Sequence, residues 1–274
     1  MAKKKGRSNG SAHRMVGAVL AVLRRNSGRT QRELARDFKI SEGLLASIEQ
    51  GRRPLHPITA AELDDFLETG GVLVAMVGHL PEADLIARWY EEFLEQERTA
   101  SYHLSYEIWL IPGLLQTRAY AESLFRSRVP AFPEEEIAER LATRMRRKEI
   151  LAREAPPTMC FVIWEAAVRA PFGGTAVWLE QLRHLRACCE LPDITVQILP
   201  MDRSSHAGCQ GPIHIMETPE PDRFVYAEGA MGTVLITAPD DIMSRCQKFD
   251  MLRSQALNPD ESMALLDQII KEER

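Results

Sequence analysis

The first eighty residues alternate short apolar stripes of helical period with turn residues. One stripe predicts a helix over residues 12–26 that ends before Gly28, and it consists of Val16, Val19, Leu20 and Leu23. Two later stripes predict helices over residues 59–67 and 72–77, separated by Gly70 and Gly71. With the two helices between them, these stripes predict a five-helix unit that ends near residue 78.

The stretch TQRELARDFKISEGLLASIEQGRR, residues 30–53, contains the two remaining helices. Thr30 starts the first as a capping box, because Glu33 lies three residues on and can reach back to the cap nitrogen. Ser41 caps the second, which ends at Gly51. The small Ala35 lets two short helices cross closely at a wide angle, so the pattern predicts a helix-turn-helix. Its predicted inward positions are Leu34, Ala35, Phe38, Ile40, Leu44, Leu45 and Ile48.

This stretch resembles the DNA-binding head of lambda-repressor-like regulators, also called the xenobiotic-response-element family. The residues that carry the resemblance are Thr30, Gln31, Leu34, Ala35, Ser41, Leu45, Ser47, Ile48, Glu49, Gly51 and Arg53. Two positions depart from the family pattern. Lys39 stands where such turns usually carry glycine, at a cost of roughly 1 kcal/mol in a left-handed conformation. Gly43 lies inside the second predicted helix and weakens it by about as much.

Charge is divided unevenly along the chain. Residues 1–60 carry thirteen basic and four acidic side chains, a net charge of +9, so the remainder carries −14 in a chain whose total is −5. Only four of the thirteen basic residues lie in the tail at positions 3–7. This split favours a nucleic-acid-binding head on an acidic body over an ordinary protein with a basic tail.

Because a helix fits the major groove, the outward residues of the second helix are the candidate base readers. They are Ser41, Glu42, Gly43, Ala46 and Ser47. Glu42 can accept from a cytosine amino group, and Gly43 can allow close approach of the backbone to DNA. The resemblance assigns Gln31 to a phosphate. Arg52 and Arg53, with Arg29 and the basic tail, are expected to neutralise further phosphates. The alternative is a structural hairpin with a solvated basic surface.

The pattern after residue 80 predicts a linker helix and then an α+β domain. We expect a DNA-binding domain over 1–80, a linker helix within 81–101 and a regulatory domain over 102–274. In that domain an extended segment from Tyr102 leads to a turn at Pro112-Gly113 and a helix capped by Thr117. The segments MCFVIWEA, ITVQILP, PIHIMET and RFVYAEG predict strands, the last two joined by a turn at 219–222. Further helices are predicted over 134–153, 176–190, 240–256 and 260–271. The predicted fold is therefore mainly α: a five-helix head followed by a small sheet wrapped in helices.

The body resembles a domain of unknown function, number 5753, of actinobacterial helix-turn-helix regulators. Its segments IPGLLQT, WEAAVR, EQLRHL, ITVQ and FVYAE carry the resemblance, which extends over about residues 102–270. The resemblance implies a transcription regulator, often encoded beside a small partner protein.

Several segments raise other chemistry. Asp202, His206, Cys209 and His214 suggest a zinc site, but no element fixes their spacing. Ser204 and Ser205 beside His206 suggest hydrolysis, but no nucleophile elbow accompanies them. Gly173-Gly174 fits a plain turn better than a phosphate loop. Glu165 and Glu228, at strand ends, either pair with an arginine such as Arg144, Arg147 or Arg169, or face an effector. The five cysteines are expected to be reduced and mostly buried.

These observations predict a sequence-specific DNA-binding transcriptional regulator, with no enzymatic activity, cofactor, metal or membrane span. Its acidic C-terminal domain is expected to bind a partner protein or an effector, and the protein is expected to be a homodimer in the cytoplasm, associated with the nucleoid. The alternative is an antitoxin-like module that neutralises a small partner protein and regulates its own operon.

Overall fold

The structure is a computed structural model that describes residues 10–80, 82–203, 205–218, 223–229, 232–236 and 239–273. The basic tail at 3–7, Ser204, the expected turn at 219–222 and the side chain of Glu228 lie outside the described residues. The chain divides into two compact units. The first contains residues 1–95 and 229–242, and the second contains residues 96–228 and 243–274.

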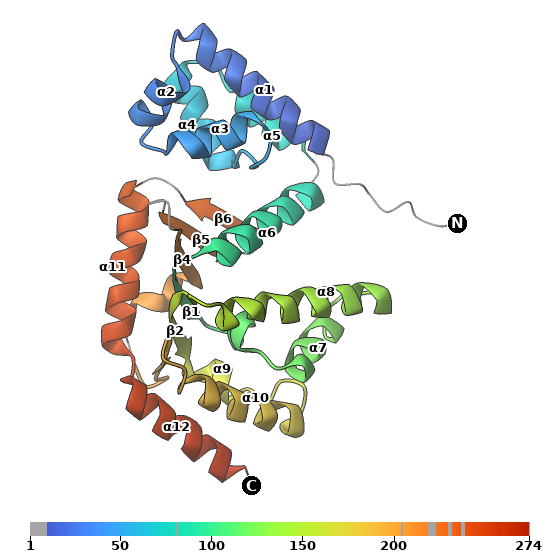
Figure 1. The fold of residues 1–274 in the computed structure, drawn as a ribbon, viewed down its shortest axis with the longest axis vertical. Coiled ribbons are helices and arrows are strands. Elements are labelled where there is room, and N and C mark those ends of the chain that lie inside the picture. Colours follow the sequence, from blue (N-terminus) through green and yellow to red (C-terminus); the bar gives the residue numbers. More distant parts are fainter. Residues whose placement is uncertain are drawn as a thin grey trace. The chain divides into compact units, whose positions relative to one another are not determined.

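All five helices predicted for the head are present (Figure 1). They are α1 (Gly10–Asn26), α2 (Gln31–Asp37), α3 (Glu42–Glu49), α4 (Pro57–Leu67) and α5 (Val72–Gly78). The predicted apolar stripes meet in one core, whose most buried members are Leu20, Leu34, Leu45, Leu63 and Leu73. The helical period of the sequence is therefore the period of the packed core.

Asp64 joins α4 to α5. Its buried carboxylate accepts backbone N–H groups from Leu73 at 3.0 Å and Val74 at 2.8 Å. First-turn amides of a helix have no intrahelical acceptor, so this carboxylate does for α5 what a cap residue usually does. Gly71 precedes the helix with a φ of 88° and supplies no side chain for that purpose.

The helix α6 (Glu82–Thr99) follows and lies within residues 81–101, where the sequence predicts a helix. The remaining helices are α7 (Arg118–Arg126), α8 (Glu134–Arg147), α9 (Glu165–Arg169), α10 (Thr175–Cys188), α11 (Pro239–Gln255) and α12 (Pro259–Glu272), with short 3-10 turns η1 (Gly113–Leu115), η2 (Lys148–Ala152) and η3 (Ala207–Gln210). The strands are β1 (Tyr102–Glu107), β2 (Thr158–Trp164), β3 (Ile194–Leu199), β4 (Ile213–Glu217), β5 (Arg223–Gly229) and β6 (Gly232–Ile236). None of the helices in the described part of the chain is long and apolar enough to cross a membrane.

Three details differ from the sequence prediction. The charged helix expected over 134–153 ends as an α-helix at Arg147 and tightens into η2. The residues after β2 turn at once into the short helix α9, and the strand β6 was not expected. The strand β6 contains only three successive large apolar residues, Val234, Leu235 and Ile236, which is too little periodicity to be assigned from sequence.

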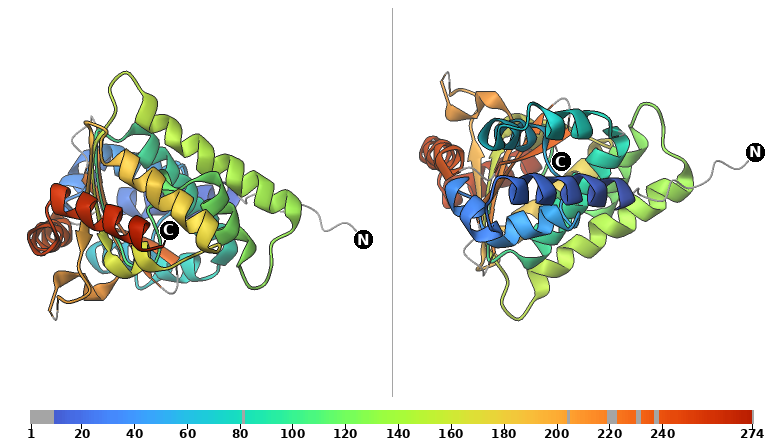
Figure 2. Two further views of the ribbon diagram at one scale, coloured as in Figure 1. Left: turned by 90° about the horizontal axis from the view of Figure 1, so that it is seen from below. Right: turned by 90° about the horizontal axis from the view of Figure 1, so that it is seen from above.

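The strand order of the sheet is β3-β2-β1-β4-β5-β6. The strands β1, β2 and β3 are parallel, whereas β4 is antiparallel to both β1 and β5. Parallel neighbours need crossover connections, and the helices α7–α8 and α9–α10 provide them. Figure 2, left, shows α8 and α10 on one face of the sheet and α11 on the other.

Strand register assigns side chains to these two faces. Phe161 and Ile163 of β2 lie in the large core that also contains Trp178 and Leu182 of α10. The residues that alternate with these along the strands face α11. Gln197 of β3 shows this, because its side-chain amide donates to backbone carbonyls in and just after that helix. The edge of β3 is closed, because the Ile198 N–H donates to Ser262 at 2.9 Å and its carbonyl accepts from Leu257.

The motif IPGLLQT is fixed by two buried glutamines. Gln181 of α10 accepts the Thr117 N–H at 2.7 Å and donates to the Leu115 carbonyl at 2.8 Å. Gln116 donates to the Ile111 carbonyl at 2.7 Å. Thr117 caps α7, as its sequence position predicted. The most specific part of the body sequence thus satisfies the backbone of a buried loop.

Glu97, in the last turn of α6, and Arg147, at the end of α8, form a buried bidentate ion pair. The guanidinium nitrogens lie 2.6 Å and 2.8 Å from the carboxylate oxygens, and Glu97 is 2% exposed. Burial alone would raise the pKa of Glu97, but the charge and hydrogen bonds of Arg147 outweigh it and hold this pKa below its ordinary value. The carboxylate therefore remains charged inside the protein.

Replacing Glu97 with Gln should lower the free energy of unfolding by about 3 kcal/mol near pH 7, because Arg147 would keep a buried charge without a counter-charge. A carboxyl group with a lowered folded-state pKa stabilises the protein above its ordinary pKa of 4.5 and loses this contribution as the pH falls. The difference between wild type and Glu97→Gln should therefore shrink as the pH falls below about 4.5. Urea titrations followed by tryptophan fluorescence measure it.

Glu190→Gln is the matched control, because it removes the carboxylate of an ion pair with Arg186 that is exposed to solvent. Its effect should stay below about 1 kcal/mol at any pH. Equal losses for the two variants, or a Glu97→Gln difference that grows in acid, would contradict this account of the buried pair.

Candidate DNA-binding interface

The start of α2 is fixed by the predicted capping box. The Thr30 hydroxyl accepts the Glu33 N–H at 3.2 Å, and the Glu33 carboxylate accepts the Thr30 N–H at 2.8 Å. The hydrogen bond from the Thr30 N–H lowers the pKa of Glu33, and so does a second one that the Thr30 hydroxyl donates to the same carboxylate at 2.8 Å. Two backbone amides at the start of the helix are thereby satisfied, and the capping-box prediction is confirmed.

The turn between α2 and α3 places Lys39 in a left-handed conformation with a φ of 58°. The Ile40 N–H donates to the Ala35 carbonyl at 2.9 Å, which closes the turn. Ser41 then caps α3 by accepting the Leu44 N–H at 3.1 Å. The strain expected at Lys39 is present, and hydrogen bonds on both sides hold it.

Two glycines let α1 approach the end of α3, and the sequence analysis did not identify this role. A Cβ atom at Gly17 would lie 2.2 Å from the Ile48 carbonyl oxygen. A Cβ atom at Gly51 would lie 2.6 Å from the Cα of Arg14, and Gly51 has a φ of 65°. The backbones of the two helices therefore meet without side chains between them, which ties the position of α3 to α1.

The predicted reading residues lie on the outward side of α3. Glu42 and Gly43 are exposed, and Ala46 and Ser47 are half-buried. The opposite side of the helix is buried and consists of Leu44, Leu45 and Ile48. Ser41 is half-buried, and its hydroxyl oxygen already accepts a hydrogen bond within the protein as the cap of α3.

Arg52 and Arg53 are fastened to the end of α3. Their backbone N–H groups both donate to the Ser47 carbonyl, at 2.9 Å and 3.1 Å. The side chain of Arg52 is exposed and that of Arg53 is half-buried. The basic turn is thus held in a fixed position relative to the outward residues of α3.

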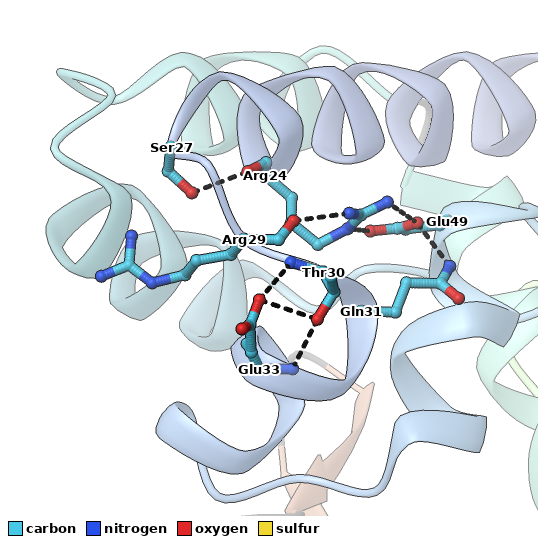
Figure 3. A network of polar contacts seen from close by, with 7 residues as sticks. All are labelled: Arg24, Ser27, Arg29, Thr30, Gln31, Glu33 and Glu49. Carbon is cyan, nitrogen blue, oxygen red and sulfur yellow. Dashed lines mark hydrogen bonds and ion pairs between the residues drawn. The ribbon is translucent and has the colours of Figure 1, made fainter.

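Gln31 belongs to a buried network around Glu49, the last residue of α3 (Figure 3). Its amide nitrogen lies 2.6 Å from one carboxylate oxygen of Glu49. Arg24, from α1, approaches the same carboxylate with two nitrogens, at 2.6 Å and 3.1 Å. Arg24 also donates to the Arg29 carbonyl at 2.8 Å. The polar end of Gln31 therefore points at Glu49. The phosphate contact expected of Gln31 would have to use the second N–H of its amide.

This network connects α1, α2 and α3 through one carboxylate. Arg24 and Glu49 are 9% and 8% exposed, so their charges are largely removed from water. The hydrogen bonds to Glu49 raise the pKa of Arg24 despite its burial. The sequence contains a signal that was not used: both residues occur beside inward-facing apolar positions, where a charged side chain requires a partner.

The body residues considered for chemistry have mostly local partners. Glu165 pairs with Arg169 at 2.6 Å, as one of the sequence alternatives proposed. His206 accepts the Gly208 N–H at 3.1 Å through Nδ1, whereas His214 lies on β4 beside Glu107. Within the described ranges, no three His, Cys, Asp or Glu side chains are placed to hold a metal ion.

The cysteine prediction needs correction. In the described part of the chain the five cysteines form no disulfide. Only Cys160 and Cys188 are buried, whereas Cys209 is exposed and Cys189 and Cys246 are half-buried. Cys209 lies in the short η3 turn, which has no apolar stripe to bury it.

Replacing Glu49 with Ala should destabilise the head by about 3 kcal/mol, because Arg24 would remain buried without a counter-charge. Protected amides of α1 and α3 should then exchange with solvent about 100-fold faster in hydrogen–deuterium exchange. The double variant Arg24→Met, Glu49→Leu should recover most of this protection. The control Arg36→Ala removes an exposed partner of Asp37. If this variant increased the exchange rates of α1 and α3 as much as Glu49→Ala does, the role assigned to the buried pair would be wrong.

Two family models match separate parts of the chain. A helix-turn-helix domain model matches residues 16–76, which contain the Glu49 network and α3. A model described as a domain of unknown function (DUF5753) matches residues 90–268, more than half of the chain. No curated protein and no solved structure matches. The chain therefore belongs to the DUF5753 family and carries a helix-turn-helix head that supports DNA binding.

Proposed function

We propose that this protein is a sequence-specific transcriptional regulator in which α3 enters the major groove of DNA. The observation that carries the proposal is the placement of α3: its apolar side is buried, its outward side is open, and its end is flanked by two arginines. Nothing but the Ser41 hydroxyl, at 4.0 Å, lies near the position of a Cβ atom at Gly43. The base-reading residues in this proposal are Ser41, Glu42, Gly43, Ala46 and Ser47, with Gln31, Arg52 and Arg53 on phosphates.

The domain division that fits this function is a DNA-binding domain over 1–80, the linker helix within 81–101 and a regulatory domain over 102–274. In this proposal the acidic regulatory domain binds an effector or a small partner protein and has no catalytic role. Its net negative charge opposes contact with DNA, which leaves DNA binding to the basic head. A nucleoid-associated protein of the cytoplasm fits these properties.

A homodimer would give the regulator a two-fold symmetric operator with half-sites roughly 34 Å apart. Support comes from α5, which contains only apolar residues. Leu73 and Val77 of this helix are buried, whereas Val72 and Val74 are 40% and 43% exposed. A helix that is apolar on every side is normally covered, and a second copy of the same helix would cover it.

Arg53→Ala should weaken binding to all DNA sequences and lower the slope of log affinity against log salt by about one. Glu42→Ala should instead change the preference at one base position, because it removes a base contact. Fluorescence anisotropy over a salt series measures the first effect. Footprinting on the upstream region of the gene, with single-base variants, measures the second.

Arg183→Ala is the control, because Arg183 is exposed on α10 in the body. It should leave both the affinity and the salt slope unchanged. Uniform weakening on every sequence by Glu42→Ala would remove this residue from the base readers. Full-strength binding by Arg53→Ala at each salt concentration would remove Arg53 from the phosphate contacts.

Val74→Glu should raise the dissociation constant of the homodimer more than about tenfold, because the charge would be buried in the α5 interface. Sedimentation velocity at several protein concentrations measures it. Val22→Glu on α1 is the control, since Val22 is equally exposed at 44% but lies outside α5. Equal effects of the two variants would exclude α5 as the specific contact.

The antitoxin-like alternative uses the same head and differs in what the body does. Under that alternative the small partner protein, produced alone, should arrest growth, and co-production of this chain should restore it. Harmless production of the partner, together with binding at many promoters, would favour the regulator.

A further inference from the structure

Two buried hydrogen-bond donors of the body have no acceptor among the described residues. Tyr106 is 0% exposed, and its hydroxyl has no hydrogen-bond partner. The indole Nε1 of Trp164 is likewise buried and without a partner. Each such group costs about 1–3 kcal/mol in lost hydration, and an acceptor from outside the chain would offset this cost.

The two donors lie on the same face of neighbouring strands. Tyr106 is paired with Val162 in the parallel ladder of β1 and β2, and Trp164 follows two residues later. Alternation along a strand therefore directs both side chains to the face that Gln197 shares with α11. They occupy the carboxyl ends of β1 and β2, the end at which open α/β sheets bind their ligands.

Two aromatic rings lie beside the ring of Trp164. The ring of Trp109 lies 6.3 Å from that of Trp164 at an interplanar angle of 69°, and the ring of His206 lies 6.0 Å away at 43°. Trp109 is 71% exposed although it is a large aromatic residue. Three rings from three separate segments thus meet at one end of the sheet, and the ring of Trp109 is largely open to solvent.

The η3 turn is built to lie against Tyr106. A Cβ atom at Gly208 would be 2.3 Å from the Tyr106 hydroxyl oxygen, so only glycine fits there. Burial raises the pKa of Tyr106 to about 12, with a smaller contribution from Cys209. The hydroxyl therefore stays protonated at neutral pH and can donate, as the indole N–H can.

We propose that the carboxyl ends of β1 and β2 form a binding site for a neutral, flat ring compound that carries hydrogen-bond-accepting oxygens. In this site the oxygens accept from Tyr106 and Trp164, and the ring stacks on Trp109. Both donors are uncharged, so a buried carboxylate or phosphate would lose its hydration without gaining a counter-charge, and neutral carbonyl or hydroxyl oxygens fit the site better. A cation would face the positive ends of one N–H dipole and one O–H dipole. The nearby Glu165 carboxylate, which could attract a cation, is already paired with Arg169.

This inference names the ligand class for the effector-binding role in the proposed function, and it rests on that part of the proposal. It does not depend on whether α3 binds DNA. A direct binding measurement on the body of the full chain therefore separates failure of the ligand site from failure of the DNA-binding proposal.

The compound 1,3-dimethyluracil, called dimethyluracil below, is a suitable probe, because its neutral ring carries two carbonyl oxygens and no N–H group. Full-length protein labelled with nitrogen-15 at its four tryptophans gives one indole N–H signal for each of them in an NMR spectrum. Single Trp→Phe variants assign these signals. Dimethyluracil should shift the signals of Trp109 and Trp164 in a saturable manner. The signal of Trp178, which donates to the Val168 carbonyl at 2.8 Å, should not move.

Tyr106→Phe should weaken dimethyluracil binding by about two- to tenfold, the loss expected for one neutral hydrogen bond. Its melting temperature should not fall, because the deleted hydroxyl has no protein partner. Tyr120→Phe is the matched control: Tyr120 is 1% exposed, and its hydroxyl accepts from the Ile111 N–H at 3.5 Å. It should leave the affinity for the probe unchanged.

Phenyltrimethylammonium and benzoate test the chemical class. Tighter binding of either ion than of dimethyluracil would overturn the assignment to a neutral ligand. Absence of a saturable shift with dimethyluracil, as expected if bound water satisfies both donors, would overturn the site itself. DNA affinity of the Tyr106→Phe variant, measured by anisotropy, should equal that of the wild type.

Discussion

The head depends on one buried carboxylate. Glu49 lies at the end of α3, where Arg24 from α1 and Gln31 from α2 both contact it. Two charges taken out of water are stable only when each satisfies the other, so the network admits little rearrangement once formed. Gly17 reinforces it from the backbone, because α1 contacts α3 there without an intervening side chain. The direction in which α3 presents its outward residues is therefore set by polar contacts as much as by apolar packing.

The body uses the same physical device for another purpose. Glu97 and Arg147 also form a bidentate pair, at the ends of α6 and α8. In both units an arginine–carboxylate pair joins helices whose apolar faces alone would allow several angles of approach. Since a guanidinium meets a carboxylate in a planar, two-bond geometry, the pair selects one angle. Such pairs add little net stability over an apolar contact, and their contribution here is orientation.

Local sequence signals were sufficient for the elements and insufficient for their contacts. The capping box of Thr30 and the helical stripes depend on residues within one or two turns, so they could be predicted and are present. The partner of Arg24 lies 25 residues away, and the Gln181 contacts with the IPGLLQT loop span more than 60. No period in the sequence encodes such distances. The short strand β6 was missed for a different reason, because its three successive large apolar residues carry too little pattern.

The two candidate sites differ in how they could be found. The outward residues of α3 can be identified from the sequence, because they lie outside the apolar stripe of the helix. Tyr106 and Trp164 give the opposite signal, since aromatic residues in strands are ordinarily core. Only the register of β1 against β2 shows that their polar atoms share a face and lack acceptors there. A binding site built from buried donors is therefore recognised by incomplete hydrogen bonding, which becomes apparent only when every neighbour is known.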